Sequence, residues 1–312
     1  MKSRLTKTPI VICLAMICCF LWGSAFPCIK IGYELFNIAE NETASQILFA
    51  GNRFAIAGIM VIIYYSIANK NIIKPSNPGK IVTLSFFQTV LQYVPFYIGL
   101  AHTTGVKASI INGSGVFITI LVSCLIFRQE KMTSKKVLGS VLGFVGVVVV
   151  NMAEVTLDLG MSFLGEGLII VSTISSAFSS AFIKKFSKKA DVIMLSGYQF
   201  FFGGIVMSVI GLLFGGKLQP QGSGSIFLLL YMGFISAAAY TLWSILLKHN
   251  NVSRISAYKF MNPVFGVLLS FIFLHEDSRM GVQIIAALVL VCGGIYIVNA
   301  GDLKYNKNSS SE

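Results

Sequence analysis

The stretch ILFAGNRF at residues 47–54 recurs in related form 146 positions later as IMLSGYQF at residues 193–200. Further matches fall on small or polar residues in other apolar stretches: Gly58 with Gly204, Val106 with Val252, Glu130 with Glu276 and, after two extra residues, Gly146 with Gly294 and Asn151 with Asn299. Apolar residues match one another readily by chance. Glycines, a glutamate and an asparagine that stay in register across four stretches indicate an internal repeat.

The whole chain around this repeat is unusually apolar. Of its 312 residues 55% are hydrophobic and only 12% are charged, and the mean hydropathy is +0.79. Ordinary soluble domains have about 25% charged residues, and a soluble fold of this composition would expose large apolar patches to water. The composition therefore excludes a cytosolic enzyme, a nucleic-acid-binding module and a disordered chain, and it predicts a polytopic membrane protein.

Apolar runs of about the 20 residues needed to cross a bilayer recur along the chain. We place ten of them, at residues 9–31, 44–68, 80–101, 106–127, 135–151, 162–183, 192–214, 225–247, 255–274 and 280–300. The prediction is an all-α polytopic membrane protein with ten transmembrane helices, in two five-helix repeats at 9–151 and 162–300 and a disordered cytoplasmic tail at 301–312. Because five is odd, the repeats enter the membrane in opposite orientations, which is typical of alternating-access transporters with a site near the midplane.

The loop charges predict the orientation. With the N-terminus inside, 19 of the 24 Lys and Arg residues lie on the inner side, as expected for a protein whose cytoplasmic loops are rich in Lys and Arg. Both termini are thus predicted to be cytoplasmic and the protein to lie in the cell membrane. The same distribution explains the net charge of +12 without a nucleic-acid partner.

Arg53 is the most informative single residue, because it lies about nine residues, or roughly 13 Å, inside its span. A charge at that depth is costly and is expected to face a cavity or a partner. Its guanidinium is suited to bidentate capture of a carboxylate. The alternatives are a structural ion pair and hydrogen bonds to carbonyls at a helix break.

Other polar and aromatic side chains on the spans complete the set of candidate substrate-binding residues: Lys30, Gln92, Tyr93, Asn112, Ser176, Tyr240, Tyr258 and Asn262. Each has a structural alternative. Lys30 can extend to the interface, serines allow close helix packing, and Tyr and Trp populate interfacial belts. We expect Trp243 in such a belt and Lys259 at the inner interface, although its place before Pro263 leaves a gating role open.

Several kinds of site are missing from the sequence. It contains no HExxH, GxSxG, P-loop or Cys–His metal spacing, so we predict no enzyme activity, no catalytic residue, no cofactor and no metal. No Asp or Glu lies at mid-membrane depth, and together with Arg53 this favours an anionic or zwitterionic substrate. Glu130 and Glu276 lie in loops among basic residues, where we expect exposed ion pairs or helix caps.

A family resemblance rests on motifs in order along the chain: FLWGSAF at 20–26 followed by Lys30, Arg53-Phe54, NPV at 262–264, FLHE at 273–276, Gln283 and Gly293-Gly294. These residues resemble the EamA-type members of the drug/metabolite transporter superfamily, over about residues 10–300. The resemblance implies a ten-helix carrier with two EamA repeats, often an exporter of amino acids, metabolites or drugs. The sequence lacks the embedded glutamate of the small multidrug relatives, which puts proton-coupled export of organic cations in doubt.

The sequence thus predicts a secondary transporter, in the sense of a permease or exporter, that moves small organic solutes such as amino acids or metabolites by alternating access. A nucleotide-sugar or drug transporter of the same fold and a facilitative channel stay open as alternatives. The expected partners are a small-molecule substrate and the lipid bilayer. Substrate identity, direction of transport, the coupling ion and a monomeric or homodimeric state are left open.

Overall fold

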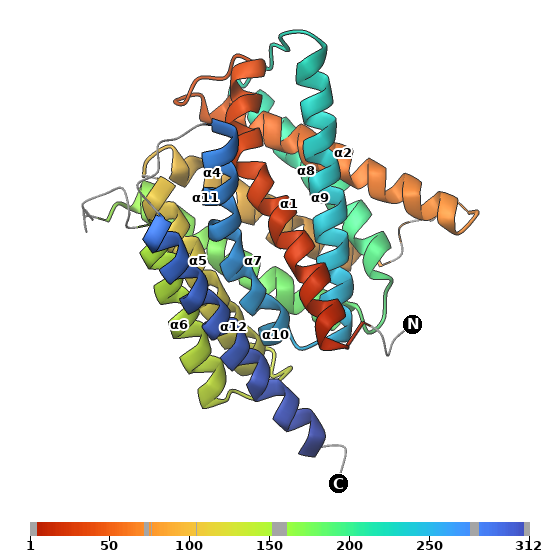
Figure 1. Ribbon diagram of the computed structural model, residues 1–312. Coiled ribbons are helices and arrows are strands. Elements are labelled where there is room, and N and C mark those ends of the chain that lie inside the picture. Colours follow the sequence, from red (N-terminus) through yellow and green to blue (C-terminus); the bar gives the residue numbers. More distant parts are fainter. Residues whose placement is uncertain are drawn as a thin grey trace.

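Long helices follow one another along the chain in the computed structural model (Figure 1), which describes residues 5–71, 75, 77–103, 105–151, 161–274 and 281–308. The helices before residue 152 are α1 (Thr8–Leu35), α2 (Thr43–Ala68), α3 (Pro78–Leu84), η1 (Ser85–Val90), α4 (Leu91–Leu100), α5 (Gly105–Leu121), η2 (Val122–Ile126) and α6 (Ser134–Asn151). Those after residue 160 are η3 (Phe163–Gly167), α7 (Leu168–Phe186), α8 (Val192–Leu213), α9 (Ser223–His249), α10 (Val252–Ser256), η4 (Ala257–Phe260), α11 (Met261–Leu274) and α12 (Gly281–Asn308).

The all-α polytopic fold class is confirmed. Among the described residues, seven helical segments are long and apolar enough to cross a membrane: Thr8–Leu35, Thr43–Ala68, Pro78–Leu100, Lys107–Ile126, Phe163–Phe186, Val192–Leu213 and Ser223–His249. The three other predicted spans coincide with α6, with the interrupted segment α10–η4–α11, and with α12, whose apolar part is Ile285–Ala300. The count of ten membrane crossings therefore stays a prediction.

The predicted division of the chain also stays a prediction. At its C-terminal end, α12 continues to Asn308, so the backbone is helical through the first part of the stretch that the sequence predicts to be disordered. Residues 309–312 lie outside the described residues.

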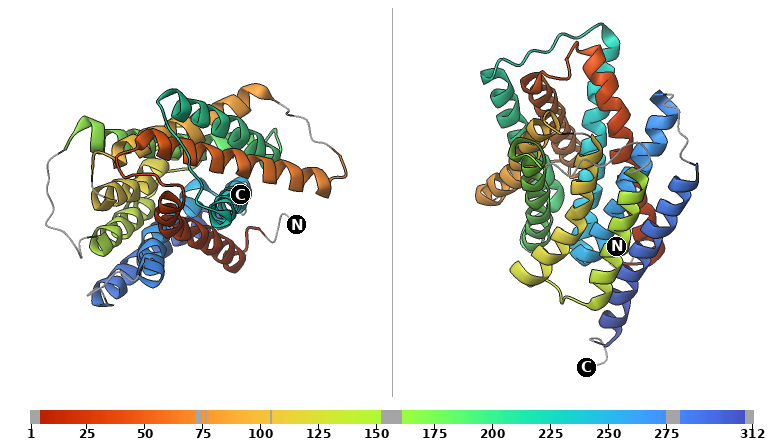
Figure 2. Two further views of the ribbon diagram at one scale, coloured as in Figure 1. Left: turned by 90° about the horizontal axis from the view of Figure 1, so that it is seen from above. Right: turned by 90° about the vertical axis from the view of Figure 1, so that its left-hand side faces the viewer.

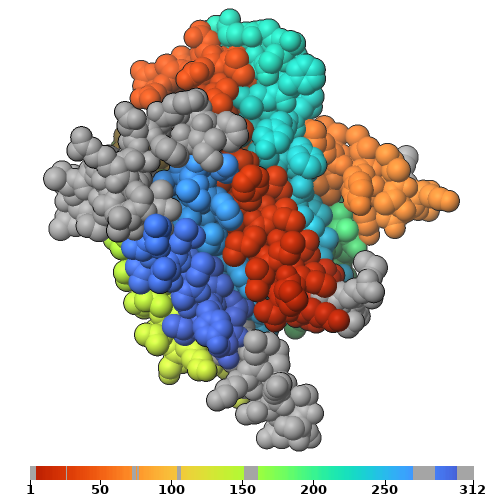
Figure 3. All heavy atoms as spheres, viewed as in Figure 1, coloured from red at the N-terminus to blue at the C-terminus, as the bar shows by residue number. Residues whose placement is uncertain are grey.

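The surface of the bundle is apolar, as a bilayer requires. Large hydrophobic side chains are exposed on several helices, among them Ile12, Ile17 and Phe20 on α1, Phe227, Leu230 and Phe234 on α9, and Ile285, Val289 and Tyr296 on α12. These three helices all reach the face shown in Figure 3. Soluble monomers rarely expose so much contiguous apolar surface, so these faces are suited to contact lipid.

Helices α2 and α8, which carry the repeated octapeptide, lie side by side (Figure 2). A Cβ added at Gly58 would lie 2.3 Å from the backbone nitrogen of Phe201, and a Cβ added at Gly204 would lie 2.3 Å from the backbone nitrogen of Ala55. A shift of 146 converts the first contact into the second. Because the later residue of each helix meets the earlier residue of the other, the two helices run antiparallel, as inverted repeats require.

Helices α6 and α12 form a second pair of this kind (Figures 1 and 2). A Cβ added at Gly146 would lie 3.0 Å from the Ala287 carbonyl oxygen, and one added at Gly294 would lie 2.6 Å from the Gly139 carbonyl oxygen. A shift of 148 relates these contacts. Small residues let the two backbones approach closely, so the glycine register that the sequence shows is also the register of the helix contacts.

Helix α1 begins and α12 ends at the same end of the bundle (Figure 1). We call this the basic end, because Lys136, Lys184 and Arg254 all make polar contacts there. An even number of crossings places both ends of a chain on one side of a membrane, which agrees with this arrangement.

Candidate substrate site

Arg53 of α2 lies inside the bundle and is only 3% exposed. Its Nε donates a hydrogen bond of 2.8 Å to the Ser236 hydroxyl of α9, and its guanidinium carbon lies 5.2 Å from the centre of the Phe54 ring. Within the described part of the chain, no carboxylate forms an ion pair with Arg53 and its two terminal nitrogens have no hydrogen-bond partner. Neither structural alternative, an ion pair or carbonyl ligands, is therefore observed among these residues.

A layer of aromatic rings lies beside the guanidinium. The Phe54 ring is 4.5 Å from Tyr93 of α4 and 5.5 Å from Phe200 of α8, centre to centre. Phe200 in turn lies 4.9 Å from Tyr240 of α9, and the hydroxyls of Tyr93 and Tyr240 form a hydrogen bond. Four helices therefore meet around these rings, two from each half of the chain.

The aromatic layer continues to a second cation. Trp22 of α1 lies 5.0 Å from Tyr240 and 4.9 Å from Trp243, centre to centre. The Lys259 ammonium of η4 lies 5.7 Å from the Trp243 ring, and it donates a hydrogen bond of 3.4 Å to the Ser176 hydroxyl of α7. The indole nitrogens of Trp22 and Trp243 are buried and have no hydrogen-bond partner.

We call this continuous set of side chains the central cluster; it consists of Trp22, Arg53, Phe54, Tyr93, Ser176, Phe200, Tyr240, Trp243 and Lys259. Its polar atoms are mostly hydrogen-bond donors, namely a guanidinium, an ammonium and two indole N–H groups. It contains no carboxylate. Such a set can bind an acceptor-rich, negatively charged group and offers aromatic surface beside it.

Five of the predicted substrate-binding residues lie together in or beside the central cluster. Arg53, Tyr93, Tyr240 and Ser176 belong to it, and the Gln92 side chain interacts with the Tyr240 hydroxyl. The sequence could not show that these residues meet, because they come from α2, α4, α7 and α9.

The other four predicted residues lie elsewhere or make no contact with the cluster. Lys30 is exposed on α1, and Asn112 is exposed on α5, where its side-chain oxygen accepts a 3.2 Å hydrogen bond from Thr173. Asn262 is half-buried, and its side-chain oxygen has no hydrogen-bond partner. Its position three residues after Lys259 keeps it close to the cluster along the chain.

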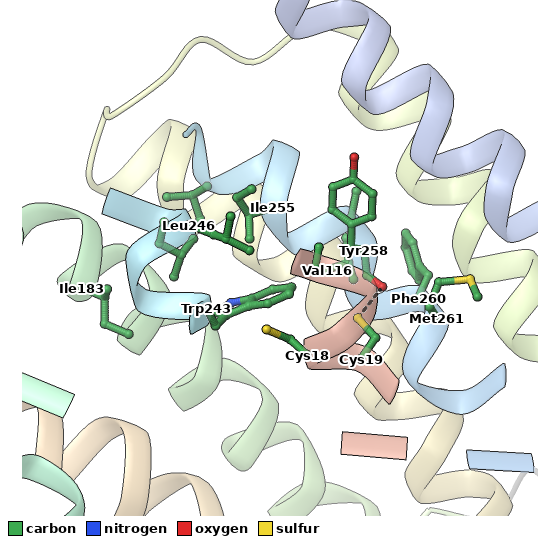
Figure 4. Close-up of a cluster of buried hydrophobic side chains, with 14 of the residues drawn as sticks. Cys18, Cys19, Val116, Ile183, Trp243, Leu246, Ile255, Tyr258, Phe260 and Met261 are labelled. Atoms are coloured by element: carbon green, nitrogen blue, oxygen red, sulfur yellow. Dashed lines mark hydrogen bonds between the residues drawn. The ribbon is translucent and has the colours of Figure 1, made fainter. Parts of the chain in front are cut away.

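Tyr258 packs in the apolar core and is 2% exposed. Figure 4 shows its hydroxyl pointing away from Trp243, and the phenol interacts with Asn299 of α12. The contact with Asn299 therefore links η4 to α12, near the basic end.

The serines of α7 divide between two roles. Ser172 donates a 2.5 Å hydrogen bond to the Gln92 carbonyl, and Ser175 donates a 2.6 Å hydrogen bond to the Phe87 carbonyl. These two bind α7 to the helices η1 and α4, which agrees with the packing alternative. Ser176 alone contacts Lys259.

Two expectations about the inner interface are wrong. Trp243 is 2% exposed and packs against buried residues such as Cys18 and Ile255 (Figure 4), so it is not part of an interfacial belt. Lys259 does not extend to the interface, because its ammonium points to Ser176 and Trp243. Trp22 was not predicted as a site residue. The sequence pointed to its surroundings only through the FLWGSAF motif, which carries the family resemblance.

Glu130 also differs from its prediction as an exposed loop residue. Its side chain is 4% exposed and forms a 2.6 Å ion pair with Lys136, which is 2% exposed. It accepts hydrogen bonds from the Ser123 hydroxyl at 2.7 Å and from both the backbone nitrogen, at 2.9 Å, and the hydroxyl of Ser253. Burial opposes ionisation, but the Lys136 ammonium and these hydrogen bonds outweigh it and hold the pKa of Glu130 below its ordinary value. Glu276, its counterpart in the repeat, lies outside the described residues.

Arg254 connects α10 to both ends of the chain. Its Nε donates to the Asn299 side-chain oxygen at 3.2 Å, and its terminal nitrogens donate to the Thr6 carbonyl at 3.3 Å, the Thr8 hydroxyl at 3.1 Å and the Asn250 side-chain oxygen at 3.2 Å. The whole Arg254 residue is only 6% exposed. Its guanidinium thus makes four hydrogen bonds, all to neutral acceptors.

Lys184 completes the contacts at the basic end. Its ammonium donates to the carbonyls of Asn250 at 2.7 Å and Lys248 at 3.2 Å, and the Asn250 amide donates to the Leu5 carbonyl at 3.0 Å. Together with Glu130 and Arg254, these groups, which we call the basic-end network, join α1, α6, α7, α10 and α12.

The chain is similar to known transporters over nearly its whole length. The model of the EamA-like transporter family matches it twice, at residues 9–152 and 163–300. An uncharacterized transporter of Archaeoglobus fulgidus is 29% identical over 285 residues, covering 89% of this chain and 94% of that protein. The uncharacterized transporter YvbV of Bacillus subtilis is 26% identical over 302 residues, covering 95% of this chain and 93% of that protein.

A solved crystal structure has the same fold, with a TM-score of 0.75 and 16% identity, covering 93% of this chain and 96% of the other. The paired match of the family model agrees with the antiparallel contacts of α2 with α8 and of α6 with α12. This chain therefore belongs to the EamA-like transporter family and is a multi-pass membrane transporter.

Proposed function

We propose that the protein is a secondary transporter of small organic anions or zwitterions, such as amino acids or other carboxylate metabolites, and that the central cluster binds the solute. One observation carries the proposal: the buried Arg53 guanidinium has donors to spare and no carboxylate partner among the described residues. An embedded charge without a counter-charge is costly. A carboxylate bound to the terminal nitrogens of Arg53 in bidentate fashion supplies that counter-charge.

The aromatic side chains fit the remainder of such a solute. Four aromatic side chains form a row in which neighbours touch. The ring centres of Phe54 and Tyr93 are 4.5 Å apart, those of Tyr240 and Trp22 are 5.0 Å apart, and the hydroxyls of Tyr93 and Tyr240 form a hydrogen bond. The faces of aromatic rings attract apolar groups and cations. An amino acid or an aryl carboxylate can therefore place its carboxylate at Arg53 and its side chain against the rings.

Alternating access supplies the mechanism in this proposal. The antiparallel, repeat-related pairs α2–α8 and α6–α12 support a movement of one repeat against the other around a central site. At the basic end the Glu130–Ser253 contacts tie η2 and α6 to α10, and a passage to that side requires them to separate.

We further infer that the basic end is cytoplasmic, with the protein in the plasma membrane, since Lys and Arg residues concentrate in cytoplasmic loops. The direction proposed is export. The chemistry needed is binding and release, so the proposal includes no enzyme activity, cofactor or nucleic-acid partner.

Transport by purified protein in liposomes tests the proposal. The assay measures counterflow of labelled amino acids, carboxylates, nucleotide sugars and cationic drugs. We expect saturable counterflow of carboxylates that Arg53→Ala abolishes, while Arg128→Ala, which removes an exposed loop guanidinium, leaves it unchanged. Flux without counterflow would indicate a channel, and a preference for nucleotide sugars or cationic drugs would assign the cluster to those solutes instead.

A further inference from the structure

Lys259 resembles Arg53, and differs from Lys136 and Lys184 at the basic end, in how few acceptors its charged group has. The Lys184 ammonium has two carbonyl ligands at 2.7 and 3.2 Å. The Lys136 ammonium has a carboxylate at 2.6 Å and a carbonyl at 2.9 Å. Lys259 has one hydroxyl at 3.4 Å, and within the described ranges no carboxylate pairs with it. The chain thus gives this ammonium fewer acceptors than it gives Lys136 and Lys184.

The groups around Lys259 add donors to this site. The Trp243 ring lies 5.7 Å from the ammonium and 4.9 Å from the Trp22 ring. Trp243 is 2% exposed, and both indole N–H groups are buried without an acceptor. A buried donor left without a partner costs about 1–3 kcal/mol. The two rings contact each other, and one of them contacts the ammonium, so their unpartnered donors indicate a place for an acceptor that the described part of the chain does not supply.

The segment that holds Lys259 is an interrupted helix. The ninth predicted span is interrupted here, since α10 ends at Ser256, the 3-10 turn η4 spans Ala257–Phe260, and Pro263 follows in α11. Such interruptions inside a membrane protein are tolerated where they are buried in protein or line a cavity. The interruption places the ammonium opposite Ser176 of α7.

We propose that Lys259, Ser176, Trp22 and Trp243 form a second anion subsite, so that the transported solute carries two negative groups, one bound by Arg53 and one by Lys259. The inference rests on the proposed function and narrows its substrate class to organic dianions, in which the second group is a carboxylate or a phosphate. A continuous path of aromatic contacts leads from the Arg53 guanidinium to the Lys259 ammonium, so each group of the dianion has its own cation.

Matched solute pairs that differ by one negative group test the proposal. We would measure binding of glutamate against glutamine, aspartate against asparagine, and O-phosphoserine against serine by calorimetry with purified protein in detergent. We expect at least one charged member to bind about tenfold more tightly than its uncharged isostere, as a charge-assisted hydrogen bond allows. The pair that shows the preference distinguishes a carboxylate from a phosphate.

The variant Lys259→Gln should reduce this preference to less than twofold and leave the affinity for the uncharged member unchanged. Lys188→Gln, at an exposed lysine of the basic end, should keep the preference. Lys259→Arg retains the charge and should keep it too, which covers the case that the glutamine variant does not fold. Equal affinities within every pair, or a preference that survives Lys259→Gln, overturn the subsite. Failure of both members of every pair to bind overturns the proposed function itself.

Discussion

The central cluster and the basic-end network both bury cations, but they satisfy them differently. In the basic-end network, Lys136, Lys184 and Arg254 are each bound by two or more acceptors of the chain. In the central cluster, Arg53 and Lys259 each have one hydroxyl ligand. The nearby indole nitrogens have none.

This difference separates structural charges from charges kept for a ligand. Burying an ion is costly unless its partners replace the lost water, and the basic-end network meets that condition with its own residues. The central cluster does not meet it within the described residues. Substitutions in the basic-end network should therefore act first on stability, and substitutions in the central cluster should act first on binding.

The largest effect is expected for Glu130→Ala. The substitution leaves the Lys136 ammonium buried without its counter-charge and leaves Ser123 and Ser253 without an acceptor. Breaking one side of a buried pair lowers the free energy of unfolding by about 3–5 kcal/mol. Thermal unfolding of the detergent-solubilised protein measures the loss.

The matched control is the double variant Glu130→Gln with Lys136→Met, which removes both charges at similar volume. Removing a whole buried pair is often close to neutral, so the double variant should unfold near the temperature of the parent. If the double variant is as unstable as Glu130→Ala, the charge pair is not the cause.

The next largest effect is expected for Arg53→Ala. Hydrogen bonds to charged groups contribute about 1.5–3 kcal/mol, so the affinity for a carboxylate solute should fall about 10- to 100-fold. Stability should change less than in Glu130→Ala, because within the described part of the chain the substitution removes one hydrogen bond, to Ser236, and the contact with the Phe54 ring, and it leaves no buried charge unpaired. Calorimetry measures the affinity and thermal unfolding measures the stability of the same sample. A large loss of stability with unchanged affinity would show that Arg53 is a structural residue.

Much of the fold could be predicted from the sequence because helix packing in a membrane depends on small residues in register. The shift of 146 that pairs Gly58 with Gly204 also relates their contacts with Phe201 and Ala55. The bounds of the helices follow the apolar runs closely, since a helix is the way to satisfy backbone hydrogen bonds in lipid.

The site was predictable only where one residue was anomalous by itself. Arg53 stood out because a charge in a span is rare. Lys259 and Trp243 were misplaced because depth was counted from the predicted span ends, whereas the helix already starts at Val252 and α9 continues to His249. Glu130 was misplaced because its partner Ser253 is 123 positions away, and no local pattern shows such a contact.

A pH titration of stability sharpens the comparison at the basic end. The pKa of Glu130 is held below its ordinary value in the folded protein. A carboxyl whose pKa is lowered by folding stabilises the protein above its unfolded pKa, and that contribution is lost as the pH falls through the folded pKa. The unfolding temperature should therefore decrease below about pH 4. The double variant without Glu130 and Lys136 should show a smaller decrease over the same range, and an identical decrease would exclude Glu130 as its source.

The smallest effect, and the most selective one, is expected for Trp243→Phe. Phenylalanine keeps an aromatic ring between Trp22 and Lys259 but removes the unpartnered indole N–H. A hydrogen bond from the neutral indole N–H to a charged group of the solute lies at the lower end of the range of about 1.5–3 kcal/mol, so the affinity should fall about tenfold. Stability should stay equal or rise, because a buried donor without an acceptor is removed.

In the basic-end network, Ser123→Ala removes a donor that has a partner, so it should lower stability and leave affinity unchanged. The two variants thus give opposite results in the measurements of affinity and stability. If Trp243→Phe loses as much stability as Ser123→Ala, the central cluster is as structural as the basic-end network.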